Sequence, residues 1–83
     1  MGNINTYALP QMLDTLGNDP ELDDDLLMGF LRQGVREITL DDGISRTIST
    51  SNDVSPSPAA DSALWVVFVA KAMVLYRQNL LDT

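Results

Sequence analysis

The residues of this chain that could do chemistry are acids and hydroxyls, because the sequence contains neither cysteine nor histidine. That composition excludes a thiolate zinc site, a cysteine nucleophile and the commonest general base. Carboxylates gather in Glu21-Leu22-Asp23-Asp24-Asp25, but this spacing does not match the alternating acids and glycine of an EF-hand loop. We therefore interpret the cluster as the solvated first turn of a helix and predict no metal site.

The remaining polar groups indicate turns rather than catalysis. Asp41-Asp42-Gly43 has the composition of a turn, and paired carboxylates need a cleft that separates their pKa values before they can do acid–base work. Ser49-Thr50-Ser51 has no histidine or lysine base close in sequence. The sequence thus predicts no catalytic residue and no cofactor, and a protein that is not an enzyme.

The first long helical pattern begins at Asp19-Pro20, which supplies an N-cap and a first helical residue. Apolar side chains then recur at every third or fourth position, so we predict a helix over about residues 20–39 within a segment 19–40. Arg32 and Arg36 are expected toward its C-terminal end, where the helix dipole favours cations.

Two glycines, Gly29 and Gly34, interrupt this helix, and each costs about 1 kcal/mol relative to alanine. Two explanations are open. The glycines are either a defect that packing tolerates or positions where another helix approaches closely.

The second long segment, residues 58–81, is apolar on nearly every face. Its centre reads Ala63-Leu64-Trp65-Val66-Val67-Phe68-Val69-Ala70, and either Ser57 with Pro58 or Asp61 supplies the helix start. A helix that is apolar all round is expected to be buried all round. The unbroken apolar run is far shorter than the ~20 residues that cross a bilayer, so we predict no membrane partner.

Two other helices can hardly cover every face of such a helix in a chain of 83 residues. Without disulfides, oligomerisation is the leading way for so small a chain to complete its core. We therefore expect its large side chains, with one from the preceding helix, to form the subunit core or a subunit interface. These residues are Phe30, Trp65, Phe68, Met73 and Tyr76.

These patterns predict a mainly α fold: one helical domain over residues 1–83, built as a small bundle of about three helices. Residues 1–18 form an N-terminal arm or a short helix ended by Gly17. Residues 41–57 form a long polar connection, which is either a loop or a short β-hairpin turning at Asp42-Gly43. Long connections of this kind are often functional, so we expect this one to contact a partner subunit.

The net charge of −7 comes from the N-terminal half, where the acids far outnumber Arg32 and Arg36. An acidic surface repels phosphate backbones and anionic membranes. Tight wrapping of nucleic acid is therefore disfavoured, whereas basic protein partners remain open.

Over residues 19–81, the order of these elements resembles the core of head-to-tail connector, or adaptor, proteins of tailed bacteriophages. Two stretches carry the resemblance, each a polar lead-in followed by an apolar helix. They are Asp24-Asp25-Leu26-Leu27 with Phe30 to Ile38, and Val54-Ser55-Pro56-Ser57-Pro58 with Asp61 to Leu75.

The resemblance implies a structural protein of the virion, assembled in the host cytoplasm, whose copies form a homo-oligomeric ring that joins portal to tail. Its partners would be other connector, portal or tail proteins, and DNA would pass through the ring without specific binding. Trp65, Phe68 and Met73 would then pack the subunit core and the contacts with neighbouring copies.

A different class of function also accounts for the charge distribution. A small acidic intracellular interaction module would capture a basic partner through the N-terminal half. Such a module is expected to be a monomer or dimer, whereas a connector is expected to form a ring-sized oligomer.

Overall fold

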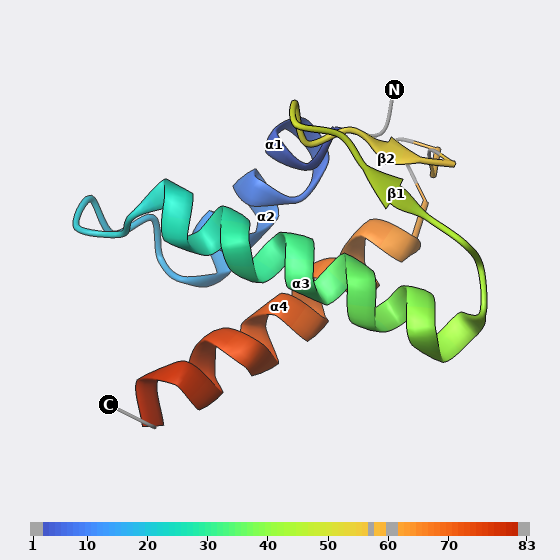
Figure 1. Ribbon diagram of the computed structural model, residues 1–83. Helices are drawn as coiled ribbons and strands as arrows, with labels where there is room; N and C mark the ends of the chain where they lie inside the picture. Colours follow the sequence, from blue (N-terminus) through green and yellow to red (C-terminus); the bar gives the residue numbers. More distant parts are fainter. Residues whose placement is uncertain (1–2, 57, 60–61, 82–83) are drawn as a thin grey trace.

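The computed structural model describes residues 3–56, 58–59 and 62–81. Two long helices cross, two short helices pack beside them, and a small antiparallel ribbon lies at the N-terminal side (Figure 1). The predicted mainly helical bundle with a small two-stranded element before the last helix is confirmed. The elements are α1 (Ile4–Tyr7), α2 (Leu9–Thr15), α3 (Asp24–Asp42), β1 (Thr47–Ile48), β2 (Val54–Ser55) and α4 (Leu64–Leu81).

The N-terminal segment is part of the bundle. The Asn3 side chain caps α1 by accepting a hydrogen bond from the backbone N–H of Asn5. Ile4, Ala8 and Met12, each four residues from the next, are completely buried. This spacing aligns them on one side of the two short helices, which pack by that side against α3 and α4.

Helix α3 begins later than predicted. Asp23, not Asp19, is the N-cap, and its Oδ1 accepts from the backbone N–H groups of Asp25 and Leu26. Asp19 instead closes a separate turn through its own side chain. Several consecutive aspartates can all act as caps, so local sequence did not specify which one starts the helix.

Helix α3 also ends later than predicted, so Asp42-Gly43 is a helix terminus and not the turn of a hairpin. Gly43 has a φ of 72° and donates its N–H to the carbonyl of Thr39, as a left-handed helix cap does. The ribbon lies further along, with Ile48 opposite Val54. The prediction that α3 carries basic residues near its C-terminus is wrong, because its last turn contains none.

Helix α4 begins at Leu64 rather than near residue 58. The proposed caps Ser57 and Asp61 lie outside the described residues, and Pro58 is described as non-helical. The Ser62 hydroxyl accepts a hydrogen bond from the N–H of Leu64 at 3.1 Å, as a capping side chain does.

The two long helices approach most closely at Gly34, which is buried. A Cβ atom added there would lie 3.0 Å from the carbonyl oxygen of Phe68 and 3.2 Å from the backbone nitrogen of Ala72, whereas one added at Gly29 would meet nothing within 4 Å. The two explanations thus apply to different glycines. Gly34 permits close approach of a helix, and Gly29 is an exposed position with no such contact.

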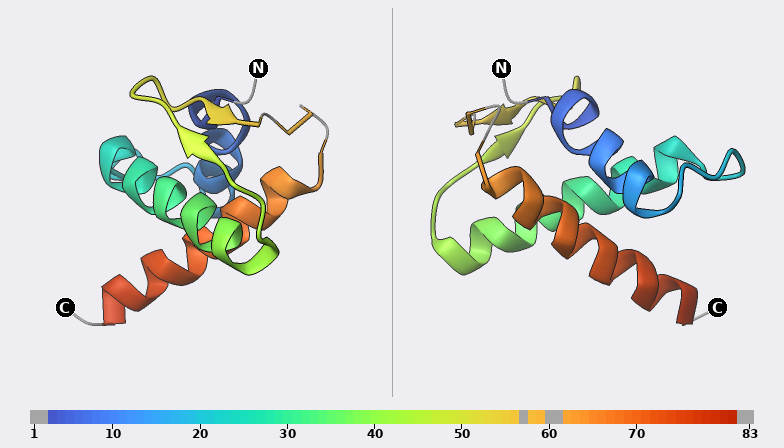
Figure 2. Two further views of the ribbon diagram at one scale, coloured as in Figure 1. Left: turned by 45° about the vertical axis from the view of Figure 1, so that its right-hand side comes forward. Right: turned by 180° about the vertical axis from the view of Figure 1, so that it is seen from behind.

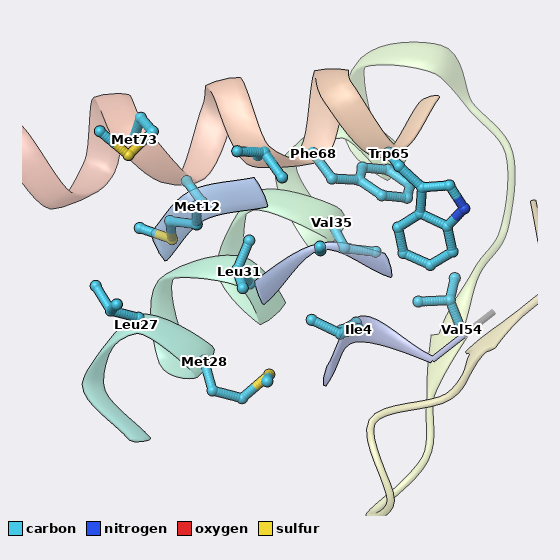
Figure 3. Close-up of a cluster of buried hydrophobic side chains, with 13 residues drawn as sticks. Ile4, Met12, Leu27, Met28, Leu31, Val35, Val54, Trp65, Phe68 and Met73 are labelled. Carbon is cyan, nitrogen blue, oxygen red and sulfur yellow. The ribbon is translucent and has the colours of Figure 1, made fainter. Parts of the chain in front are cut away.

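The core lies in the angle between α3, α4 and the short helices (Figure 3). Trp65 and Phe68 are its largest side chains, with ring centroids 5.6 Å apart in an edge-to-face arrangement. The indole N–H of Trp65 donates to the carbonyl of Ala59 at 3.0 Å. The buried apolar residues are Ile4, Ala8, Met12, Leu27, Met28, Leu31, Val35, Val54, Trp65, Phe68, Val69, Ala72 and Met73.

The long polar connection is attached to the bundle near its first strand by Arg46. Its guanidinium forms a two-pronged ion pair with Asp42, with Nη2–Oδ2 at 2.7 Å and Nη1–Oδ1 at 3.1 Å. The same group lies 5.5 Å from the ring centre of Phe68, and the Arg46 side chain is only 3% exposed. This cation therefore joins the start of the connection to the end of α3 and to the core.

A second attachment holds the turn between β1 and β2. Asn52 adopts a φ of 68° and accepts hydrogen bonds from the backbone N–H of Ile4 at 2.9 Å and from Nε of Arg32 at 2.6 Å. Asn3 adds a contact from its side-chain amide to the carbonyl of Ser51. The turn is thus fixed to both α1 and α3.

Candidate functional site

The five residues predicted for the core or interface all lie inside the subunit or at its margin. Trp65, Phe68 and Met73 are buried. Phe30 and Tyr76 are half-buried and meet edge to face, with ring centroids 5.7 Å apart. None of the five lies on the surface of α4 that faces away from the bundle.

That surface is nevertheless apolar. Val66 is 58% exposed, Val67 42% and Val74 46%, and Leu81 near the C-terminus is 84% exposed; Ala70 between them is also exposed. We call these five residues the outer face of α4. The expectation that α4 is buried on all sides is therefore wrong for the single subunit, because α3 and the short helices cover one side only.

The geometry of the helix explains why one side of α4 is buried and the opposite side is exposed. Successive residues are turned by about 100°, so Phe68 and Ala72, which lie against Gly34, share one side of α4. Val67, Ala70 and Val74 are spaced by three and four residues and lie on the opposite side, the spacing with which two helices pack along a seam. Seen from behind, α4 lies in front of α3, and no other element passes across it (Figure 2, right).

Sequence reasoning missed the outer face because it selected the largest side chains, four of them aromatic. The small and β-branched residues at three- and four-residue spacing were visible in the sequence. What was lacking was the orientation of the helix, which Gly34 supplies by identifying the side of α4 that another backbone touches.

A second surface lies on the other side of the molecule, where α3 passes under the ribbon (Figure 1). Arg32, Arg36, Ile48, Ser49 and Thr50 line a groove of about 450 Å³. An adjoining, more apolar hollow of similar volume includes Leu40, which is 82% exposed. Guanidinium and hydroxyl groups are donors, so the first groove is suited to an anion.

The acids do not form a metal site in the described part of the chain, where no group of three or more acidic side chains is arranged around a common point. Glu21, Asp23, Asp24 and Asp25 are all exposed at the start of α3. One carboxyl group has a shifted pKa: the hydrogen bond from Arg46, followed by one from the backbone N–H of Ile44, lowers the pKa of Asp42.

By length and composition, α4 is the one helix of the described residues that could cross a membrane. The core helix of a globular domain meets the same criteria. Here one side of α4 supplies Trp65, Phe68 and Ala72 to the core, and the absence of a membrane partner stays a prediction.

No protein-family model, curated protein or solved structure matches this chain at a significant level.

Proposed function

We propose that this protein is a non-catalytic assembly subunit whose copies associate through the outer face of α4, and that the assembly is the ring of a tailed-phage head-to-tail connector. In this role it is a structural component of the virion that joins portal to tail and lets DNA pass. Its contacts are with its own copies and with other connector, portal or tail proteins.

The observation that carries the proposal is the exposed apolar surface of α4. Single exposed apolar residues are ordinary on protein surfaces, but here Val66, Val67, Ala70 and Val74 are contiguous on one side of one helix. Full burial of a valine side chain stabilises a protein by ~1.5–3 kcal/mol. Each valine exposed to water lacks part of this stabilisation. Contiguous apolar surfaces of this kind commonly mark sites of protein contact.

The charge distribution and the order of elements support the more specific part of the proposal. A chain with a net charge of −7 repels a DNA duplex, which suits a ring through which DNA passes without binding. The resemblance to phage connector proteins rests on the acid-capped helix, the polar connection and the apolar last helix.

The test is the mass of the protein in solution, measured by native mass spectrometry and light scattering over a range of concentrations. We expect the wild type to form a closed oligomer of one size, and Val67→Glu to be monomeric with unchanged helix content by circular dichroism. Asn79→Asp is the matched control, because it adds a negative charge to α4 at an exposed position outside the outer face. It should assemble like the wild type.

The alternative function, a small acidic module that captures a basic partner, is favoured by one observation. Glu21, Asp23, Asp24 and Asp25 are exposed together at one end of the molecule. A wild type that remains monomeric at every concentration, with Val67→Glu indistinguishable from it, would contradict the ring and favour this module. Trp65 is unsuitable for the same test, since it lies in the subunit core.

A further inference from the structure

Two arginines on α3 lack the acidic neighbours that often accompany cations on a helix. No acid stands three or four positions from Arg32 or Arg36, and the two arginines are themselves four residues apart, which sets like charges side by side. Both lie in the middle of α3, beyond the region where the helix dipole would stabilise them. Their charges are therefore not balanced by their own helix.

Only part of this positive charge is used within the subunit. Arg32 donates through Nε to Asn52, whereas Arg36 is exposed and makes no hydrogen bond or ion pair with the described residues. Together with Ser49 and Thr50 they line the groove of about 450 Å³. We call it the arginine groove. Planar guanidinium groups beside hydroxyls bind carboxylates with matched geometry.

The same chain carries carboxylates that have no partner of their own. Glu21, Asp24 and Asp25 are exposed, and their side chains make no hydrogen bond or ion pair with the described residues. Asp24 lies at the start of α3, about 18 Å along the helix axis from Arg36 at a rise of 1.5 Å per residue. That separation is too long for an ion pair inside one subunit.

We propose that the arginine groove binds the acidic segment Glu21–Asp25 of a second copy of this chain. The complementary charges occupy different parts of the surface, so the contact joins unlike surfaces of successive subunits. Contacts of that type build a ring when the rotation closes. The inference rests on the proposed function, and it names the polar contact that would accompany the apolar one made by α4.

A charge exchange tests this contact. The first variant is Arg36→Glu, which cancels the positive charge of Arg32 in the groove, and the second is Glu21→Lys with Asp24→Lys, which cancels the negative charges of Asp23 and Asp25 in the segment. Each variant alone removes the charge attraction between groove and segment, and the dissociation constant of its assembly should rise by roughly tenfold or more. In an equimolar mixture, the new acid of the first variant faces the new lysines of the second wherever the two alternate, so the mixture should assemble more tightly than either variant alone.

The control is Asp41→Lys, which reverses an exposed acid at the far end of α3 and should leave assembly unchanged. Salt provides a second readout, because rising NaCl concentration screens contacts between exposed charges far more than apolar ones. Circular dichroism on every variant verifies that the helices are retained.

The results distinguish the two proposals. Assembly of Arg36→Glu at wild-type strength overturns the groove contact, while dissociation of Val67→Glu in the same series leaves the proposed function standing. The groove contact is also overturned if inorganic phosphate binds the wild type but not Arg36→Glu, and Arg36→Glu assembles normally. That result assigns the groove to a phosphate ligand. A monomeric wild type removes the proposed function and, with it, the contact.

Discussion

Replacing Gly34 by alanine tests whether α3 and α4 meet as closely as the structure shows. In an open helix this substitution stabilises by about 1 kcal/mol, because alanine restricts the unfolded chain and favours the helix. At Gly34 the new Cβ would lie 3.0 Å from the carbonyl oxygen of Phe68 and 3.2 Å from the nitrogen of Ala72. Both are backbone atoms that cannot rotate away, so the helices must separate, at a cost of about 1–3 kcal/mol.

Gly29 offers a matched control on the same helix, since a Cβ there meets nothing within 4 Å. Gly29→Ala should be stabilised by about 1 kcal/mol and Gly34→Ala should be neutral or destabilised. The two variants should therefore differ by about 2 kcal/mol in free energy of unfolding, which for a domain of this size corresponds to roughly 8–16 °C in Tm.

The assay is urea unfolding followed by circular dichroism, with both variants and the wild type at one protein concentration. Equal m-values are needed for the midpoints to report stability. If Gly34→Ala proves as stable as Gly29→Ala, the close crossing at Gly34 is wrong, and with it the assignment of the inner and outer sides of α4.

Three further predictions concern side chains that hold the bundle together. Arg46→Lys should lower the midpoint of a urea titration, because an ammonium cannot reproduce the two-pronged pair with Asp42. The lowered pKa of Asp42, whose ordinary value is 3.8, means that its ionised form is favoured by folding. Its stabilising contribution should be present above that value and disappear as the pH falls through the lower pKa of the folded state, so wild type and Asp42→Asn should differ in urea midpoint at pH 7 and converge in strong acid. Trp65→Phe should destabilise by about 1–3 kcal/mol, since it removes buried volume and leaves the carbonyl of Ala59 without its indole donor; a change below about 0.5 kcal/mol, the usual range for surface positions, would contradict the placement of Trp65 in the core.

The local sequence determined which segments form the long helices and which form the connection between them. Apolar residues at three- and four-residue spacing predicted both long helices, because burial of one side stabilises a helix with that period. The lack of cysteine and histidine removed whole classes of chemistry by composition alone. The polar composition of residues 41–57 predicted a connection with loop or hairpin structure, and a short ribbon is present there.

Tertiary structure decided the boundaries of the elements. Asp19 and Asp23 are equally good caps by type, and in the folded chain Asp23 caps α3 whereas Asp19 closes the turn before it. Asp42-Gly43 suits a hairpin turn or a helix end, and the helix end is accompanied by the contact of Arg46 with the ring of Phe68, a residue distant in sequence. Alternatives of similar local energy are separated by contacts between residues distant in sequence.

The candidate surfaces also depended on tertiary structure. The sequence showed that α4 carries too many apolar residues for so small a chain to cover, but not which of them would remain exposed. The crossing at Gly34 turns Phe68 and Ala72 inward and leaves Val67 and Val74 in solvent. The arginine groove likewise exists only because the turn at Ser49 and Thr50 is held over α3, a long-range contact that no local pattern encodes.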